Sequence, residues 1–139
     1  MSVTRPVVGV EAALAAVYGG LNDARAAHGE TSGVAVAVVG PAGELVAFGA
    51  HDLVGPLPRR VALRKAYTAV LLRRSTREAA ASVADGRLDL EQLGDDELLV
   101  VPGGEPVRSG GAVLGAVGVS GLSADDDEAI AVELVQRLV

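Results

Sequence analysis

A glycine-rich apolar stretch near the end of the chain places the strongest constraint on its fold. Residues 110–128, GGAVLGAVGVSGLSADDDE, join a glycine turn to an apolar run and then to the start of a helix. In an extended strand this run has apolar or small side chains on both faces, which is typical of a central strand covered on both sides. The alternating glycines indicate the close approach of a helix, a partner subunit or a ligand. Ser123 is a favourable N-cap residue, and the aspartates at 125–127 suit the first turn of a helix.

The other apolar patterns predict a single α/β domain, of the α+β type, over residues 1–139. Apolar residues recur every three or four positions between Val10 and about Ala27, which predicts a helix. Two apolar runs joined by the turn at 40–43 predict a β-hairpin. In chain order we expect a helix at 10–27, strands at 33–39 and 44–49, helices from about 58 and from 75 to about 86, a loop at 85–96, strands at 98–101 and within 105–111, the central strand, and a helix to the end.

Composition narrows the classes of partner. Half of the 139 residues are hydrophobic and the mean hydropathy is +0.38, so we expect part of the apolar surface to be buried in a homo-oligomer. No apolar run approaches the roughly 18 residues that a membrane span needs, so no membrane partner is expected. The net charge of −6 repels a nucleic-acid backbone and argues against nucleic acid as a partner.

Several site classes are excluded by what the sequence lacks. It has no cysteine, which rules out disulfides, thiolate nucleophiles and Cys-based metal sites. Its glycines fit neither the phosphate-loop nor the dinucleotide-binding spacing, and residues 118–122 lack the second glycine of a nucleophile elbow. The beginning of the chain, MSVTRPVVGVEAAL, lacks the charged and long apolar regions of a signal peptide, which predicts a cytoplasmic location.

Three segments in the same order resemble the GlcG-like family, also called the haem-degrading domain family. They are VAVAVVGPAGELVAFGAHD at 34–52, ALRKAYTAVLLRRST at 62–76 and VPGGEPVRSGGAVLGAVGVSGLSADDDEAIA at 101–131. The resemblance implies a profilin-like α/β sandwich, in which helices cover both faces of a five-stranded antiparallel sheet. It also implies assembly into dimers up to octamers, and haem as the best-known ligand. The chain departs from the family pattern at Gly40, which replaces an aspartate, and at Ala50, which replaces an arginine.

The two histidines are the first candidate site residues. His51 directly follows a predicted strand and precedes Asp52, in a loop position where functional residues often lie. Its neutral imidazole is suited to ligate haem iron or to act as a general acid or base, with Asp52 orienting the ring; the alternative is a solvated loop histidine. His28 is a weaker candidate iron ligand, because a cation at the end of a helix also stabilises the helix dipole.

A cluster of basic residues is the second signal. Seven of the twelve lie between Arg59 and Arg77, where they suit carboxylates, phosphates or haem propionates, or else pair with neighbouring acids. Lys65, the only lysine, matches the lysine of the family's KAYTA helix and predicts either a ligand contact or a buried ion pair. Arg108 is placed to line the same cleft as the unhindered backbone amides of Gly103 and Gly104.

Two functions follow from these residues. In the first, the chain is a small oligomeric binding protein that holds haem or another anionic small molecule between the sheet, the Lys65 helix and a neighbouring subunit. In the second, it is an enzyme that acts on a small carboxylated substrate, with His51 as acid or base and with Arg59, Lys65 or Arg108 holding the carboxylate. A purely structural assembly role would involve neither a ligand nor an activity.

Overall fold

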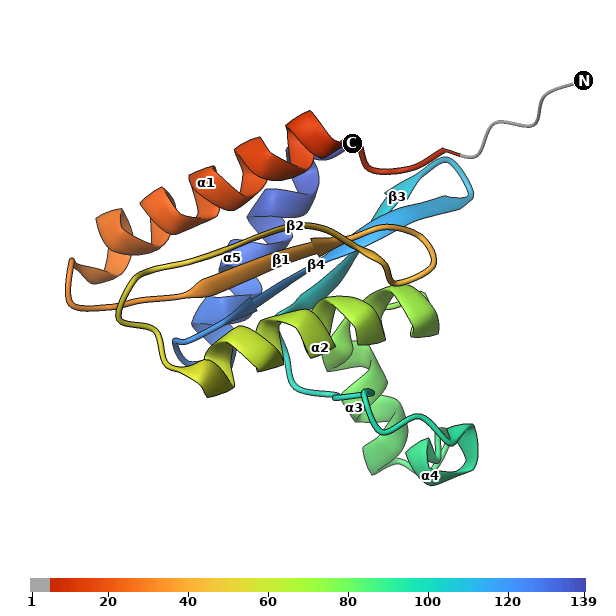
Figure 1. Ribbon diagram of the computed structural model, residues 1–139. Helices are drawn as coiled ribbons and strands as arrows, with labels where there is room; N and C mark the ends of the chain where they lie inside the picture. The colour runs from red at the N-terminus through yellow and green to blue at the C-terminus, as the bar shows by residue number, and fades with distance from the viewer. Residues whose placement is uncertain (1–5) are drawn as a thin grey trace, which may run out of the picture.

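The computed structural model describes residues 6–139, which form one antiparallel sheet with helices on both faces (Figure 1). Four strands lie in the order β2-β1-β4-β3. The elements in chain order are α1 (Val10–His28), β1 (Ala35–Val39), β2 (Leu45–Ala50), α2 (Pro56–Leu72), α3 (Thr76–Ala84), α4 (Leu90–Leu93), β3 (Gly104–Ser109), β4 (Ala112–Ser120) and α5 (Ala124–Gln136). The predicted α+β class and the central position of β4 are confirmed.

In the part of the chain that the structure describes, the sheet has four strands, so the prediction of five is wrong. The predicted strand at 98–101 is irregular because its backbone bonds to side chains of α2 instead of a neighbouring strand. Arg64 donates to the carbonyls of residues 96, 97 and 98, and the Leu99 N–H donates to Thr68 Oγ1 over 2.8 Å. The short helix α4 also interrupts the stretch that we predicted as a loop.

Helix α1 runs unbroken through Gly19 and Gly20, although glycine is unfavourable in the interior of a helix. A Cβ at Gly20 would lie 2.8 Å from Leu134 Cδ1, and one at Gly19 would lie 2.1 Å from the Arg137 guanidinium. The two glycines therefore let α1 pack closely against α5.

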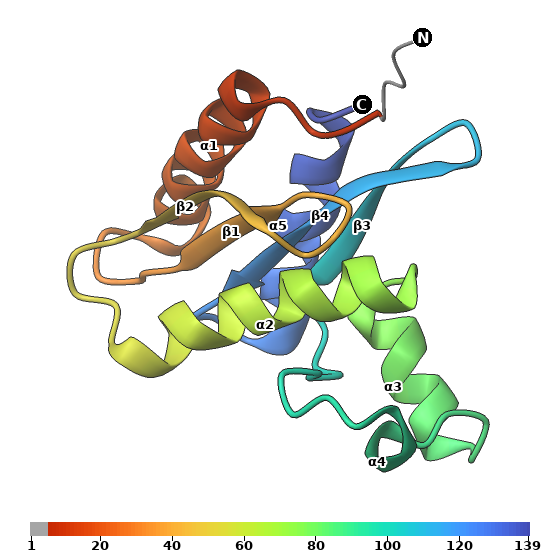
Figure 2. The same cartoon turned by 45° about the vertical axis from the view of Figure 1, so that its right-hand side comes forward.

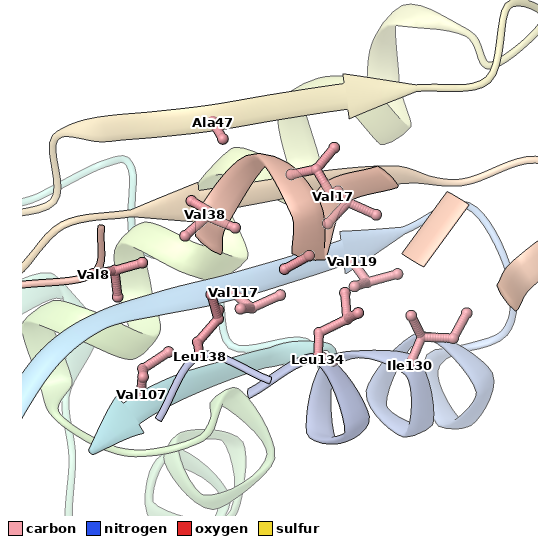
Figure 3. Packing of buried hydrophobic residues seen from close by; sticks show 14 of the residues in the cluster. Val8, Val17, Val38, Ala47, Val107, Val117, Val119, Ile130, Leu134 and Leu138 are labelled. Carbon is pink, nitrogen blue, oxygen red and sulfur yellow. The ribbon is translucent and has the colours of Figure 1, made fainter. Parts of the chain in front are cut away.

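Helices α1 and α5 cover one face of the sheet over a core of branched aliphatic side chains (Figure 3). Val17 of α1, Val38 of β1, Val117 and Val119 of β4, and Leu134 of α5 meet there. The outer strand β3 adds Val107 to the same face. Burial of these side chains supplies the hydrophobic stabilisation of this layer.

Helix α2 covers the opposite face, and alanine dominates the contact. The buried residues here are Ala35, Ala37, Val39, Ala62, Ala66, Ala69, Val70 and Ala116. A Cβ at Gly118 would lie 2.0 Å from the Ala62 carbonyl oxygen, so only glycine lets α2 approach β4 this closely. The sequence left open whether a helix, a partner subunit or a ligand approaches the glycines of this strand, and at Gly118 it is the helix α2.

Helices α3 and α4 extend away from the sheet beyond the end of α2 (Figure 2). None of the helices within residues 6–139 is long and apolar enough to cross a membrane.

Candidate functional site

His51 joins α1 to the start of β1. Its Nδ1 accepts the Val34 N–H over 2.9 Å, so its Nε2 carries the proton and donates to the Leu21 carbonyl over 3.0 Å. The side chain is nearly buried, with 8% of the residue exposed. Both ring nitrogens are therefore engaged with backbone groups, and the ring would have to leave one of them before it could ligate iron or exchange a proton.

A polar pocket of about 320 Å³ opens beside His51, between α1 and the end of β2. We call it the α1–β2 pocket, and it is lined by Tyr18, Leu21, Asn22, Arg25, Ala50, His51 and Asp52. Tyr18, Asn22 and Arg25 are spaced four and three residues apart on α1, so they share one face of that helix. Ala50 and Asp52 form the opposite wall, where β2 ends.

Four polar side chains of the α1–β2 pocket other than His51 are free to meet a ligand. Within residues 6–139, the side chains of Tyr18, Asn22, Arg25 and Asp52 have no hydrogen-bond or ion-pair partner. Leu21 and Ala50 contribute apolar surface beside them. A few convergent polar groups around an apolar wall are characteristic of small-molecule sites, and the Arg25 guanidinium is suited to a carboxylate.

Lys65 forms a buried ion pair, one of the two alternatives that the sequence left open. Only 1% of the residue is exposed, and Nζ donates to Asp127 Oδ2 over 3.1 Å and to the Val119 carbonyl over 2.8 Å. Burial is the main reason that the pKa of Lys65 is lowered and that of Asp127 is raised, although each charge partly offsets the shift of the other. Asp127 Oδ1 also accepts the Leu122 N–H over 2.9 Å. The pair thus connects α2 to the first turn of α5 around the end of the sheet.

Gly103 and Gly104 pack against Lys65 itself. A Cβ at Gly103 would lie 2.8 Å from Lys65 Nζ, and one at Gly104 would lie 2.3 Å from the Lys65 carbonyl oxygen. Both glycines are buried, and their lack of a side chain makes room for α2. Gly103 and Gly104 thus lie beside the buried ion pair of Lys65 and Asp127, whereas Arg108, which we predicted to share their cleft, donates to the Arg73 carbonyl.

The arginines that the sequence grouped with Lys65 have separate partners. Arg59 donates to the carbonyls of Val54 and His51 over 2.9 and 3.2 Å, so it fixes the loop before α2. Arg108 donates to the Arg73 carbonyl at the end of α2. His28 is half-buried in the last turn of α1, where the Ser32 hydroxyl donates to its carbonyl. The predicted site residues therefore lie in several places, and of them His51 and Asp52 line the α1–β2 pocket. Backbone groups, not Asp52 as predicted, orient the His51 ring.

Sequence reasoning missed Asn22 and Arg25 as pocket residues, and it gave Asp127 only a helix-capping role. The one sequence pattern that could have identified them is that polar residues recur three and four positions apart on α1. Polar residues spaced in this way usually form the solvent-exposed face of a helix, so the pattern by itself does not predict a pocket. The residues described contain no cluster of three or more His, Asp or Glu side chains suited to a metal ion.

Comparison with known proteins identifies the family. A family model described as "Haem degrading protein HbpS-like" matches residues 9–136. The chain belongs to this family. HbpS and a variant of Streptomyces reticuli HbpS, both solved as crystal structures, are each 29% identical to it with a TM-score of 0.86. Each match covers 99% of this chain, together with 94% of HbpS and 91% of the variant.

Two further matches are more limited. The crystal structure of a PduOC–haem complex has a TM-score of 0.83, covers 94% of both chains and is 21% identical, so it supports the fold alone. An uncharacterised 15.0 kDa protein from the dhaT–dhaS intergenic region of Citrobacter freundii is 38% identical over 73 residues. That match spans about half the length of each chain, 51% of both.

Proposed function

We propose that this HbpS-like protein binds haem or another anionic small molecule in the α1–β2 pocket. The observation that carries the proposal is the Arg25 guanidinium, which has no partner within residues 6–139 and lines the same pocket as the Tyr18 phenol. Membership of the family and the haem complex of a protein with the same fold make haem the first ligand to test.

The residues of the α1–β2 pocket fit one edge of haem. Arg25 would hold a propionate, Leu21 and Ala50 would contact the macrocycle, and the Tyr18 oxygen is a suitable ligand for ferric iron. His51 would serve mainly to fix the wall, since its ring holds Leu21 and Val34 in place. His28 lies three residues after Arg25 on α1 and outside the pocket lining, so it would reach iron only if haem extends past Arg25. Bound haem would supply a redox-active iron.

A haemin titration followed by the Soret band tests this proposal. We expect a saturable, sharp band with the wild type, a weakening of about tenfold, or about 1.4 kcal/mol, in Arg25→Gln, and a changed band shape in Tyr18→Phe. Arg87→Gln is the matched control, because Arg87 is an exposed arginine paired with Asp85 away from the pocket. His51→Ala and His28→Ala complete the series. A featureless wild-type titration would exclude haem as the ligand. Equal binding by all variants would show that haem binds outside the α1–β2 pocket.

A second candidate function is an enzyme for a small carboxylated substrate. Its support is the pocket volume of about 320 Å³, which lies at the lower end of the range for ligand sites. Arg25 would hold the carboxylate, while Asp52 or a released His51 would accept a proton. The test is thermal stabilisation by small carboxylates: stabilisation in the wild type and its loss in Arg25→Gln, without haem binding, would favour this function.

We also propose that the chain forms a homo-oligomer through the outer face of α1. Val10 and Leu14 of α1, with Val7 just before the helix, form a row of large apolar side chains there, each about half exposed. Light scattering should give a mass above the 14.0 kDa of one chain, and Leu14→Glu should lower that mass. A monomeric wild type would contradict this proposal.

The cytoplasmic location stays a prediction from the sequence.

A further inference from the structure

The two edges of the sheet differ in how they are protected. Strand β3 forms one edge, and it carries Glu105, Pro106 and Arg108, with a bulge just before Arg108. Charged side chains, proline and bulges all hinder the pairing of a further strand with an edge. The start of β3 is also bonded to α3, where the Gly104 N–H donates to Thr76 Oγ1 over 2.9 Å. This edge is therefore poorly suited to accept another strand.

Strand β2 forms the opposite edge and carries no such side chains (Figure 1). Its residues 45–50, LVAFGA, include no charged residue and no proline. An irregularity in its pairing lies near its start, opposite Val38 and Val39, so the part from Ala47 to Ala50 is regular. An apolar edge strand of this kind is a template for pairing with another strand.

The backbone of β2 has hydrogen-bonding groups on its outer side. The His51 N–H donates to the Val34 carbonyl over 3.1 Å, in the direction of β1. Such groups alternate in direction along an antiparallel strand. Phe48 and Ala50 lie an odd number of positions before His51, so their N–H and C=O groups point away from β1. Within the described residues 6–139 no hydrogen bond reaches these groups, which makes them available to a second strand.

The exposed apolar row of α1 lies along the same edge. A short loop joins the end of α1 to the start of β1, and β1 runs antiparallel to β2, so α1 and β2 run in the same direction (Figure 1). Tyr18 of α1 and Ala50 of β2 line the same pocket. Leu14 precedes Tyr18 by about 6 Å of helix, and Phe48 precedes Ala50 by about 7 Å of strand. Leu14, which is 54% exposed, is therefore level with Phe48.

Two copies of β2 can pair with each other. Antiparallel pairing about a twofold axis perpendicular to the sheet sets Phe48 of one copy opposite Phe48 of the other, so that each Phe48 N–H donates to the other's carbonyl. Because α1 packs on β2, with Val17 against Gly49, the same axis brings the two α1 helices together at Leu14. A stable interface buries roughly 1,200 Å² or more in total, which a pair of short strands alone does not reach. The apolar rows of the two α1 helices add the area that the strands lack.

We propose that β2 pairs with β2 of a second copy of this chain, so that the two sheets become continuous and the α1 helices meet at Leu14. The inference rests on the homo-oligomer proposed above, and it adds the strand that joins the copies. The occupant of the edge is a second copy because the open part of β2 and the apolar row of α1 share one centre, at Phe48 and Leu14. A twofold axis through that centre matches each feature with itself.

Hydrogen exchange of individual amides in the full chain tests the strand pairing. The Phe48 and Ala50 amides should exchange at least about tenfold more slowly in the wild type than in Leu14→Glu, which places charges at the axis and separates the copies. The amides of Ala47 and Gly49, which face β1, are the internal control and should be equally protected in both proteins. Light scattering on the same samples gives the mass.

The outcomes separate this inference from the homo-oligomer itself. An oligomeric wild type whose Phe48 and Ala50 amides exchange as fast as those of Leu14→Glu would overturn the β2 pairing and leave the α1 contact in place. A monomeric wild type would overturn both proposals.

Ala50→Pro tests the edge without a change in α1. It removes an outer N–H group, and proline is tolerated in an edge strand where the N–H faces away from the sheet. We expect the dissociation constant of the oligomer, measured by light scattering over a dilution series, to rise at least about tenfold. Ala50→Gly is the matched control, because it loses the same side chain but keeps the N–H group. Equal dissociation constants for the two variants would overturn the pairing.

Discussion

The two faces of the sheet are packed by different means. Under α1 and α5, branched side chains such as Val119 and Leu134 interlock, and burial of their methyl groups stabilises the layer. Under α2, alanines and Gly118 bring the helix backbone close to the strand, with little side-chain volume between them. The first face should therefore be sensitive to the removal of atoms and the second to their addition.

The α2 face also contains a charge where the other face contains leucine. Lys65 is the largest of the fully buried side chains, and its ammonium group is neutralised by Asp127. On the surface, Arg77 forms a similar pair with Glu128 of the same helix α5. Each of these two pairs connects α5 to a helix that lies before β3 in the chain, but one pair is buried and the other is exposed. Comparing them therefore separates the effect of burial from the effect of charge pairing.

The largest effect is expected from Lys65→Met. This change leaves Asp127 buried without its cation and should lower the free energy of unfolding by about 3–5 kcal/mol. The double variant Lys65→Met/Asp127→Leu should recover most of the loss, since two apolar side chains need no partner. Urea denaturation at fixed protein concentration measures both. A double variant as unstable as Lys65→Met would show that the ion pair stabilises the fold beyond the mutual neutralisation of its two charges.

Leu134→Ala tests the aliphatic face. Leu134 is fully buried in α5, and its truncation should cost about 2–5 kcal/mol through lost burial and a residual cavity. Leu53→Ala is the control, because 99% of Leu53 is exposed, and its midpoint of urea denaturation should stay at the wild-type value. Equal midpoints for the two variants would contradict the core assigned to this face.

Gly118→Ala tests the close-packed face with a single added methyl group. The new Cβ would lie 2.0 Å from the Ala62 carbonyl oxygen, so α2 must move and the loss should be about 1–3 kcal/mol. Gly111→Ala in the β3–β4 turn is the control, since its Cβ has no atom within 4 Å. Thermal unfolding of both variants distinguishes overpacking from a general effect of alanine in this hairpin.

The smallest effect is expected from Arg77→Ala. Its ion pairs are exposed, and solvent screens such pairs strongly. Burial and the charges of Glu128 and Glu78 raise the pKa of Glu105 to about 7, and Arg77 opposes this shift. We expect no measurable change in the midpoint of urea denaturation, whereas the pKa of Glu105, measured by NMR titration, should move upwards because a nearby cation is lost. A loss of stability as large as that of Lys65→Met would remove the distinction between the buried and the exposed pair.

Much of the fold follows from sequence patterns alone. The helix predicted at 10–27 is observed as Val10–His28, and the hairpin predicted at 33–49 is observed as β1 and β2. The residues at 98–101 were assigned wrongly because their apolar run resembles a strand. Their backbone is bonded to the side chains of Arg64 and Thr68, which lie some 30 positions earlier, and a local sequence pattern cannot predict such a contact.

The candidate site was less accessible to sequence analysis. A cluster of arginines around Lys65 suggested an anion site, but the N–H groups of a guanidinium can also donate to backbone carbonyls. Arg59, Arg64 and Arg108 all donate to carbonyls of loops or helix ends. Conversely, the place of Arg25 in a pocket could not be predicted, because a lone arginine on an exposed helix face carries no distinctive pattern.

The sequence by itself determined the α+β class, the central glycine-rich strand and the family, because these depend on local periodicity and on collinear motifs. Only the tertiary structure decided which groups meet. It paired Lys65 with Asp127 across 62 positions and placed Tyr18 and Arg25 opposite Asp52. The physical reason is that side-chain partners depend on how helices pack across the sheet, and that packing sets burial, charge and the pocket together.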